Sequence, residues 1–323
     1  MLLQKEMVAS ATQQAMGTLM CHRIYGRHAE DCLAVVCSEI SRLEGLLSCF
    51  QPQSEISQIN QLAGREGVRI SFETFEVLDQ AFDFSRANCG FFDVTIAPLV
   101  RLWSEGRRTL SQPDHASIQQ VLPLVNYGDL ILNNQEMTAG LRNPGQAIDL
   151  GGIGKGFAGS KILEIFAAFD ITCAYSNLGG NVVALGTKPD GSAWRIGIQH
   201  PRLEDRLIGA VSVVDRSVVT SGDYQRCFTD KKGVRHHHIL DPLTGYPSRS
   251  GLISVTIVSE DPLAADVLST AVFIAGLKKG CELLSRYPNT EAIIVDEDMQ
   301  AFITKGLKGR FQTDESVRLV ILE

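Results

Sequence analysis

The sequence predicts an α+β fold, with mixed strands and helices in one domain that covers residues 1–323. Three observations support this prediction. Strand-like segments dominate the second half of the chain, and helical periodicity appears towards both ends and in the middle. Strands and helices do not alternate regularly, as a βαβ fold would require. The sequence also contains no internal repeat and no long linker, and 323 residues suffice for one large domain.

The first half of the chain is predicted to hold a strand and two helices. Residues 16–26 form the predicted first strand. A long amphipathic helix follows, because apolar residues recur at steps of three and four, and Pro52 lies beyond its end. Its apolar positions are Leu33, Val36, Ile40, Leu43, Leu47 and Phe50. A second helix is expected between Ser71, as its N-cap, and Gly90. Its apolar positions are Phe72, Phe75, Leu78 and Phe82.

The rest of the chain is predicted to be rich in strands. Residues 111–145 are expected to form a short helix, strands and turns. Residues 148–169 are expected to run from a strand through clustered glycines into a helix, with Ile162, Leu163 and Phe166 facing inward. The remaining predicted elements are short strands between 174 and 224, a buried strand over 253–261, a helix from Pro262, and closing strands over 291–298 and 317–323.

Composition and charge narrow the classes of function. The net charge of -7 argues against a protein that holds nucleic acid through phosphate contacts, although a local basic pocket for one phosphorylated ligand remains compatible with it. No apolar stretch approaches the roughly 18 residues of a membrane helix, and the first residues do not resemble a secretory signal.

The eight cysteines contain no Cys-x-x-Cys pair and are interpreted as free, buried thiols. A disulfide framework is the alternative, but it suits a large chain with irregular spacing less well. The sequence therefore predicts a cytoplasmic protein with no integral membrane segment.

The segment 148–156, IDLGGIGKG, is a candidate loop for an anionic ligand. Its glycines let the backbone approach a bulky ligand, and the N–H groups of the following helix favour an anion. Lys155 adds a positive charge, and Asp149 offers an acceptor for ring or ribose donors. The segment matches neither a Walker A loop nor a strict Gly-x-Gly-x-x-Gly fingerprint. A tight turn with a helix cap is the alternative interpretation.

Asp266 and Thr270 are four residues apart on a predicted helix and therefore share one face. A carboxylate and a hydroxyl are hard oxygen ligands suited to a Mg²⁺ ion that is shared with a phosphate. The alternative is an ordinary solvated pair, which the apolar neighbours make less favourable.

Two neighbouring segments supply candidates for proton transfer. The segment 219–228 clusters polar residues that include Asp223 and Arg226, and the segment 236–242 follows it. If the latter is extended, His236 and His238 lie on one face and His237 on the other. A base or hydrogen-bonding role is better supported than zinc binding, since no partner has metal-site spacing. Ordinary strand residues are the alternative interpretation.

An aromatic segment, 91–103, begins with two Phe residues and Asp93 and ends in Trp103. It is consistent with a wall for ring stacking that carries one polar handle. Core packing is the alternative, because aromatic stripes more often belong to the core.

Nine segments together resemble one family, the ApbE-like FAD:protein FMN transferases, in the family's order and over nearly the whole chain. They are Met16-Gly17-Thr18, SEISQIN, FFDVTIAPLVRLW, IDLGGIGKGFA, SNLGGN, WRIGIQHP, VTSGDYQR, HHILDPLTGYP and ADVLSTA. The resemblance implies a T-fold-related flavin transferase domain, either undivided or in two lobes with the FAD and Mg²⁺ site between them.

The resemblance implies Mg²⁺-dependent transfer of FMN from FAD to a Ser or Thr hydroxyl of an acceptor protein, with release of AMP. The acceptor would be a redox protein with a flavinylation motif. Carried over by position, the FAD site would comprise Met16, Phe50, Phe91, Phe92, Asp93, Asp149, Lys155 and Leu240. The metal would be held by the Gly152 carbonyl and the side chains of Asp266 and Thr270. Phe50 stands where the family often has Tyr, and the lipoprotein signal common in the family is not seen here.

Phosphoryl transfer also needs a group that accepts the proton of the acceptor hydroxyl, and His238 or Asp223 is the candidate. Arg226 is expected to steady a phosphate or to position Asp223. Three other functions remain open: a Mg²⁺-dependent FAD pyrophosphatase, a non-catalytic FAD-binding protein and a redox flavoenzyme.

Overall fold

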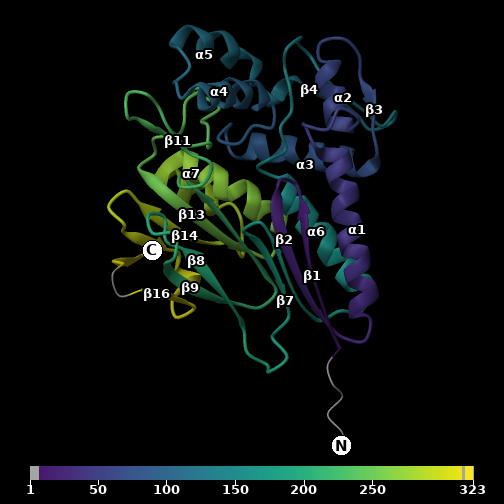
Figure 1. The fold of residues 1–323 in the computed structure, drawn as a ribbon, viewed down its shortest axis with the longest axis vertical. Coiled ribbons are helices and arrows are strands. Elements are labelled where there is room, and N and C mark those ends of the chain that lie inside the picture. Colours follow the sequence, from purple (N-terminus) through teal and green to yellow (C-terminus); the bar gives the residue numbers. More distant parts are fainter. Residues whose placement is uncertain (1–6, 315–316, 323) are drawn as a thin grey trace, which may run out of the picture.

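The computed structural model describes residues 7–314 and 317–322, which form three layers (Figure 1). Nine strands of this part of the chain make one sheet, in the order β1-β2-β6-β7-β10-β13-β14-β15-β17. Their bounds are Val8–Ala15, Thr18–Tyr25, Cys173–Leu178, Asn181–Leu185, Arg216–Gly222, Leu252–Ser259, Glu291–Asp296, Ala301–Ile303 and Leu319–Ile321, in the same order. Neighbouring strands are antiparallel except β15 and β17, which are parallel. The α+β prediction is confirmed.

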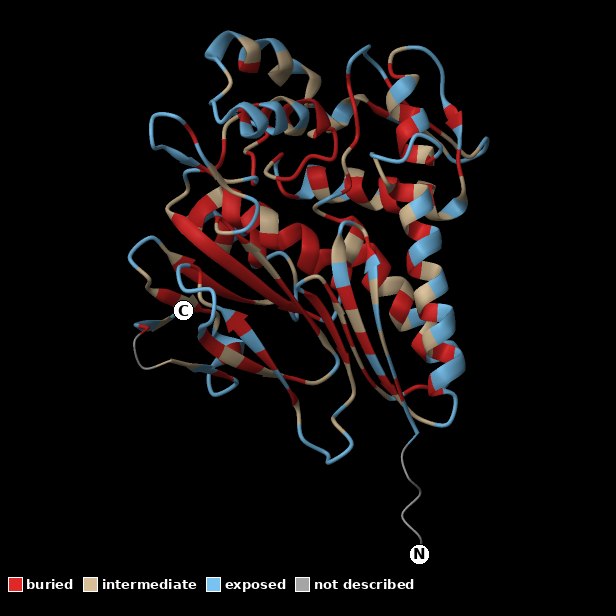
Figure 2. Cartoon of the chain, in the orientation of Figure 1, coloured by how far each residue is buried: buried red, intermediate tan, exposed pale blue. Residues whose placement is uncertain are grey.

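Three helices cover one face of this sheet: α1 (Ala29–Leu47), α6 (Gly154–Ala168) and α7 (Pro262–Leu284). A second sheet packs on the opposite face, in the order β16-β9-β8, with bounds Phe311–Thr313, Leu207–Val213 and Trp194–Gln199. The apolar core between the sheets includes Trp194, Val211, Val218 and Val295. Figure 2 shows α7 and β13 almost entirely buried in the middle of the molecule, whereas the outer face of α1 is exposed.

The remaining helices lie above the main sheet in Figure 1. They are α2 (Glu55–Gln61), α3 (Phe72–Ala87), α4 (Ala97–Thr109) and α5 (His115–Val121). A small sheet joins them, in the order β3-β5-β4, with bounds Val68–Arg69, Thr138–Leu141 and Leu130–Asn133. The hairpin of β11 (Phe228–Thr229) and β12 (Arg235–His236) lies on the same side as α4 (Figure 1).

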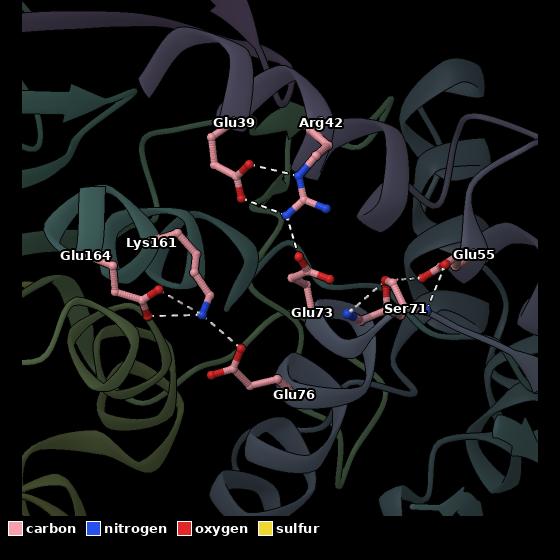
Figure 3. A network of polar contacts seen from close by, with 9 residues as sticks. Glu39, Arg42, Glu55, Ser71, Glu73, Glu76, Lys161 and Glu164 are labelled. Carbon is pink, nitrogen blue, oxygen red and sulfur yellow. Dashed lines mark hydrogen bonds and ion pairs between the residues drawn. The ribbon is translucent and has the colours of Figure 1, made fainter. Parts of the chain in front are cut away.

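Ion pairs join α3 to α1 and α6 (Figure 3). Arg42 on α1 contacts Glu73 on α3 at 2.7 Å, and Lys161 on α6 contacts Glu76 on α3 at 2.9 Å. Both pairs are partly accessible to solvent, so each contributes only about 1 kcal/mol. Their effect is therefore to fix the orientation of α3 rather than to supply most of its stability.

The strand predicted over 16–26 is present as β2, but it is not the first strand of the described chain. β1 precedes it, and Met16 and Gly17 form the turn into β2, with φ values of 48° and 71°. β1 escaped detection because it is an edge strand whose only buried residues are Ala9 and Ala15, so it carries no strong apolar alternation.

The helix predictions are confirmed with corrections. α1 buries Val36, Ile40, Leu43 and Leu47 as predicted, but Phe50 lies beyond its end and is 85% exposed. The Ser71 side chain caps α3 by accepting the Thr74 N–H, as predicted. Phe72 is wrongly placed on the apolar face, because the buried stripe of α3 runs through Thr74, Val77, Leu78, Ala81 and Ser85. The residues just before α6 form no strand.

The cysteine prediction is partly wrong. All eight cysteines lie within the described ranges and form no disulfide bond, but only Cys32 is buried and Cys89 is exposed. Among the helices that the structure describes, none has the length and apolarity needed to cross a bilayer.

His22 makes folding sensitive to acid. Its side chain is 2% exposed, its Nδ1 lies 3.0 Å from Ser176 Oγ, and burial lowers its pKa to about 4. Between pH 6.5 and 4 the unfolded chain binds a proton here that the folded chain does not, so stability falls as the pH falls. We expect the free energy of unfolding to fall by about 3 kcal/mol over that pH range because of His22. Urea unfolding of the wild type and of His22→Leu tests this, and equal pH slopes would contradict it.

Candidate functional site

The glycine-rich loop leads directly into the N-terminus of α6. Asn60 fixes the chain just before the loop, since its side chain exchanges two hydrogen bonds with the backbone of Ile148, at 2.6 and 2.9 Å. Asp149 Oδ1 accepts the Gly151 N–H at 2.7 Å.

Most N–H groups at the start of α6 already have partners within the protein. The Gly154 N–H donates to the Leu150 carbonyl oxygen at 2.7 Å, and the Gly156 N–H donates to Asp266 at 2.8 Å. Lys155 stands in that first turn.

Helices α6 and α7 meet where Asp266 faces this loop. The Gly156 N–H donates to Asp266 Oδ2 at 2.8 Å, and Lys155 Nζ lies 3.8 Å from Asp266 Oδ1. Asp266 is 4% exposed, so its carboxylate is buried and held by one N–H and one ammonium. Its Oδ1 accepts no hydrogen bond from the Gly156 N–H and can therefore serve as a ligand for a cation.

Thr270 lies one turn further along α7, on the same face. A Cβ placed on Gly152 would lie 3.8 Å from Thr270 Oγ1 and 3.2 Å from a ring carbon of Phe92. The structure thus brings Gly152, Asp266 and Thr270 to one place, as their assignment to one site requires.

The oxygens of these three residues fit a hard divalent cation. They comprise a carboxylate, a hydroxyl and a backbone carbonyl, which is a donor set suited to Mg²⁺. Among the residues that the structure describes, no group of three or more His, Cys, Asp or Glu side chains could hold a metal. A structural zinc site is therefore not supported in this part of the chain.

The contact between α6 and α7 requires glycine at position 156. A Cβ there would lie 2.7 Å from Asp266 Cβ and 2.8 Å from Leu263 Cα. We expect Gly156→Ala to lower the free energy of unfolding by about 1–3 kcal/mol, because α6 and α7 must move apart. Gly154→Ala is the matched control, since its Cβ would meet nothing nearer than 3.8 Å. Urea denaturation compares the two variants, and an equal cost would contradict the close contact.

His238 is exposed, and the charges of Arg226 and of Lys155 on α6 both act on its ring. Its Nδ1 is 3.0 Å from the Gln225 carbonyl oxygen, which can only accept, so Nδ1 carries the proton and Nε2 is free to accept one. Desolvation by the surrounding atoms lowers its pKa to about 4, and the charges of Arg226 and Lys155 act in the same direction. Burial raises the pKa of the Asp149 carboxyl, and the positive charge of Arg226 acts against this rise.

Asp223 is held between two arginines that the sequence prediction did not anticipate. Its carboxylate accepts two hydrogen bonds from Arg202, at 2.7 and 2.9 Å, and one from Arg235, at 2.9 Å. Among the described residues its ion pairs are with these arginines and not with Arg226. Asp223 lines a cavity of about 300 Å³ with Trp103, Arg235, His237 and Arg249, which contains none of the predicted FAD or metal residues.

The three consecutive histidines have separate surroundings. β12 ends at His236, and the chain bends at His238, so the extended conformation that would place these two on one face is not formed. His236 Nε2 lies 3.1 Å from Asp230, and His237 Nε2 lies 3.0 Å from the Ser248 carbonyl oxygen. Of the three, His238 is the exposed one, and the charge of Lys155 on α6 acts on its ring.

Asp93 organises its own loop. Its Oδ1 accepts hydrogen bonds from the Thr95 backbone and hydroxyl, at 2.8 and 2.6 Å, and its Oδ2 accepts the Tyr127 N–H at 2.9 Å. Burial raises its pKa. Both oxygens are thus engaged, so the carboxylate shapes the wall that carries Phe91 and Phe92 rather than projecting from it as a handle.

The other predicted FAD residues differ widely in exposure. Phe92 is 5% exposed, whereas Phe91 is half-buried, with Lys279 Nζ 5.5 Å from its ring centroid. The backbone N–H of Met16 donates to Glu44 Oε1 at 2.9 Å. Leu240 is buried in a cluster with Leu99, Trp103 and Ile118. Phe50, in contrast, is 85% exposed and accessible to a ligand.

Two solved ApbE proteins have the fold of this chain. The ApbE protein of Thermotoga maritima superposes with a TM-score of 0.82 and 30% identity, over 96% of this chain and 98% of that chain. The flavin transferase ApbE of Vibrio cholerae shares the fold, with a TM-score of 0.84 and 23% identity, over 94% and 99%. Together these structures show that the chain has the fold of the ApbE proteins.

The chain belongs to the ApbE family, whose model matches residues 16–294. An FAD:protein FMN transferase of Klebsiella pneumoniae is 35% identical over 315 residues, which is 97% of each chain. One of Treponema pallidum is 31% identical over 319 residues, covering 93% of this chain and 88% of the relative. The family predicted from the sequence motifs is confirmed.

Proposed function

We propose that the protein transfers FMN from FAD to a Ser or Thr hydroxyl of an acceptor protein, in a Mg²⁺-dependent reaction that releases AMP. The observation that carries this proposal is the buried Asp266 carboxylate, placed beside Thr270, Lys155 and the N-terminus of α6. A protein that only bound FAD would have no need for a buried carboxylate next to a pyrophosphate, because the two charges repel each other. A divalent cation between them removes that conflict.

In the proposed reaction the acceptor hydroxyl oxygen attacks the FMN phosphorus. A new phosphoester bond forms, the bond from that phosphorus to the bridging oxygen breaks, and AMP leaves with that oxygen. The hydroxyl proton passes to Nε2 of His238, which is free because Nδ1 donates to Gln225. We assign Asp223 an orienting role, since two guanidinium groups already occupy its carboxylate.

Asp266, Thr270 and the Gly152 carbonyl would hold the Mg²⁺ ion, which supplies charge neutralisation at the pyrophosphate. Lys155 and Arg226 bind phosphate oxygens from the side of the loop. The flavin and adenosine parts of FAD contact Met16, Phe50, Phe91, Phe92, Asp149 and Leu240, with Asp93 shaping the wall behind them. Phe50 offers a ring for stacking but no hydroxyl.

We further propose a redox protein as the acceptor and the cytoplasm as the location. Eight cysteines that form no disulfide bond are compatible with a reducing compartment. Fractionation of cells that express the tagged chain tests the location, and recovery outside the cytoplasm would overturn it.

The test of the proposed function mixes the protein with FAD and Mg²⁺, with and without an acceptor domain that carries a Ser/Thr flavinylation sequence. We expect AMP release together with flavin fluorescence on the acceptor after denaturing electrophoresis. Both should disappear when a chelator is added. Release of AMP and free FMN with an unlabelled acceptor would instead favour a Mg²⁺-dependent FAD pyrophosphatase, in which water replaces the acceptor hydroxyl.

A further inference from the structure

A chain of three hydroxyl groups connects β10 to the metal side of α7. Ser221 Oγ lies 2.8 Å from Ser269 Oγ and 3.2 Å from Thr270 Oγ1. Ser269 Oγ donates to the Asp266 carbonyl oxygen at 2.8 Å. Ser269 is fully buried, whereas Ser221 and Thr270 are half-buried. The series of hydrogen-bonded hydroxyl groups therefore starts at the edge of the site and ends inside helix α7.

The direction of these hydrogen bonds is fixed by counting protons. A carbonyl oxygen can only accept, so the single hydroxyl proton of Ser269 points to Asp266. Ser269 Oγ can then only accept a hydrogen bond from Ser221, so the hydroxyl proton of Ser221 points to Ser269. The remaining contact requires Thr270 to donate its proton to Ser221 Oγ.

This direction determines what Thr270 presents to the site. A hydroxyl that donates its proton away from a cation keeps both lone pairs available to it. A hydroxyl that accepts from Ser221 would lose one lone pair and turn its own proton towards the site. The orientation therefore favours a cation ligand, and groups behind the ligands of a metal tune its affinity.

We propose that Ser221 is a positioning residue that orients the Thr270 hydroxyl for the divalent cation, with Ser269 setting the direction of its proton. This inference rests on the proposed function, because it assumes a cation on Asp266 and Thr270. It adds two residues that do not touch the cation and that the sequence motifs did not single out for the metal.

The neighbouring residue offers a matched control. Thr220 lies on the same strand, and its Oγ1 forms a 2.8 Å hydroxyl–hydroxyl hydrogen bond with Thr256. Because side chains alternate along a strand, Thr220 points to the sheet face opposite α7. Thr220→Val therefore removes a similar hydrogen bond from the same strand without disturbing the metal side.

The test measures binding of Mn²⁺ to the whole protein by electron paramagnetic resonance, without any turnover. We expect Ser221→Ala to raise the Kd for Mn²⁺ about 10-fold, within the range for groups behind metal ligands. Ser269→Ala should also raise it, because Ser221 can then donate to Thr270. The double variant should be no worse than Ser221→Ala alone, since both act through Thr270. Thr220→Val should leave the Kd unchanged.

The outcomes separate this inference from the function on which it rests. If the wild type binds Mn²⁺, Asp266→Asn does not and Ser221→Ala binds like the wild type, the inference fails and the metal site stands. If the wild type and Asp266→Asn show equally little binding, the metal site itself fails. Melting temperatures without metal identify a variant that does not fold, and Ser269→Ala then decides the question in place of Ser221→Ala.

Discussion

Replacing Asp266 by Asn is expected to reduce FMN transfer at least about 100-fold, since a cation at the pyrophosphate is worth several kcal/mol to the transition state. Asn keeps an oxygen that can accept the Gly156 N–H, so the junction of α6 and α7 is preserved. The loss would therefore come from the missing negative charge and not from unfolding.

The measurement is AMP release and acceptor labelling as a function of Mg²⁺ concentration. Asp261→Asn serves as the control, because Asp261 is an acid on the same helix that only caps its first turn by accepting the Leu263 N–H. That variant should behave like the wild type. Unchanged transfer by Asp266→Asn at limiting Mg²⁺ would remove Asp266 from the metal site.

Replacing His238 by Ala is expected to lower the rate of transfer about 10²–10⁴-fold at neutral pH, the usual contribution of a positioned base. The ring has a pKa of about 4 in the free protein, so it is neutral and able to accept a proton throughout the neutral range. His115→Gln is the control. His115 lies on α5, where it contacts Tyr246, and α5 does not form part of the loop. Wild-type rates for His238→Ala would exclude this base.

The pH dependence of the rate tests the role of His238 independently. Protonation of the free enzyme should lower kcat/KM as the pH falls towards 4. Bound FAD adds negative charge near Arg226 and Lys155, so the acid limb of kcat should lie at a higher pH than that of kcat/KM. His238→Ala should lose this limb, and a limb that persists in the variant would belong to another group.

Sequence patterns predicted the elements that bury a regular apolar stripe. α1 follows from Val36, Ile40 and Leu43, and the buried strand β13 follows from its run of apolar residues. β1 could not be predicted, because an edge strand is stabilised by pairing with β2 and needs few apolar residues. Phe72 was misassigned, because periodicity alone does not show where the neighbouring core lies.

The candidate site was predictable only where its residues share one element. Spacing placed Asp266 and Thr270 on one helix face. It could not show that Gly156 meets Asp266 from 110 positions away, and the grouping of these residues came from the family resemblance. Arg202 and Arg235 were missed, since their pairing with Asp223 joins a loop, a strand end and a hairpin that only the folded chain brings together.

The position of Lys155 against Asp266 has a consequence for how the enzyme matures. A buried carboxylate without a partner would make folding depend on the cation, as in small zinc domains that are unfolded without metal. Here the Gly156 N–H and the Lys155 ammonium already compensate the charge of Asp266. The polypeptide can therefore fold before any cation arrives. In the proposed reaction, the cation would therefore bind to a protein that is already folded, and it could enter together with FAD.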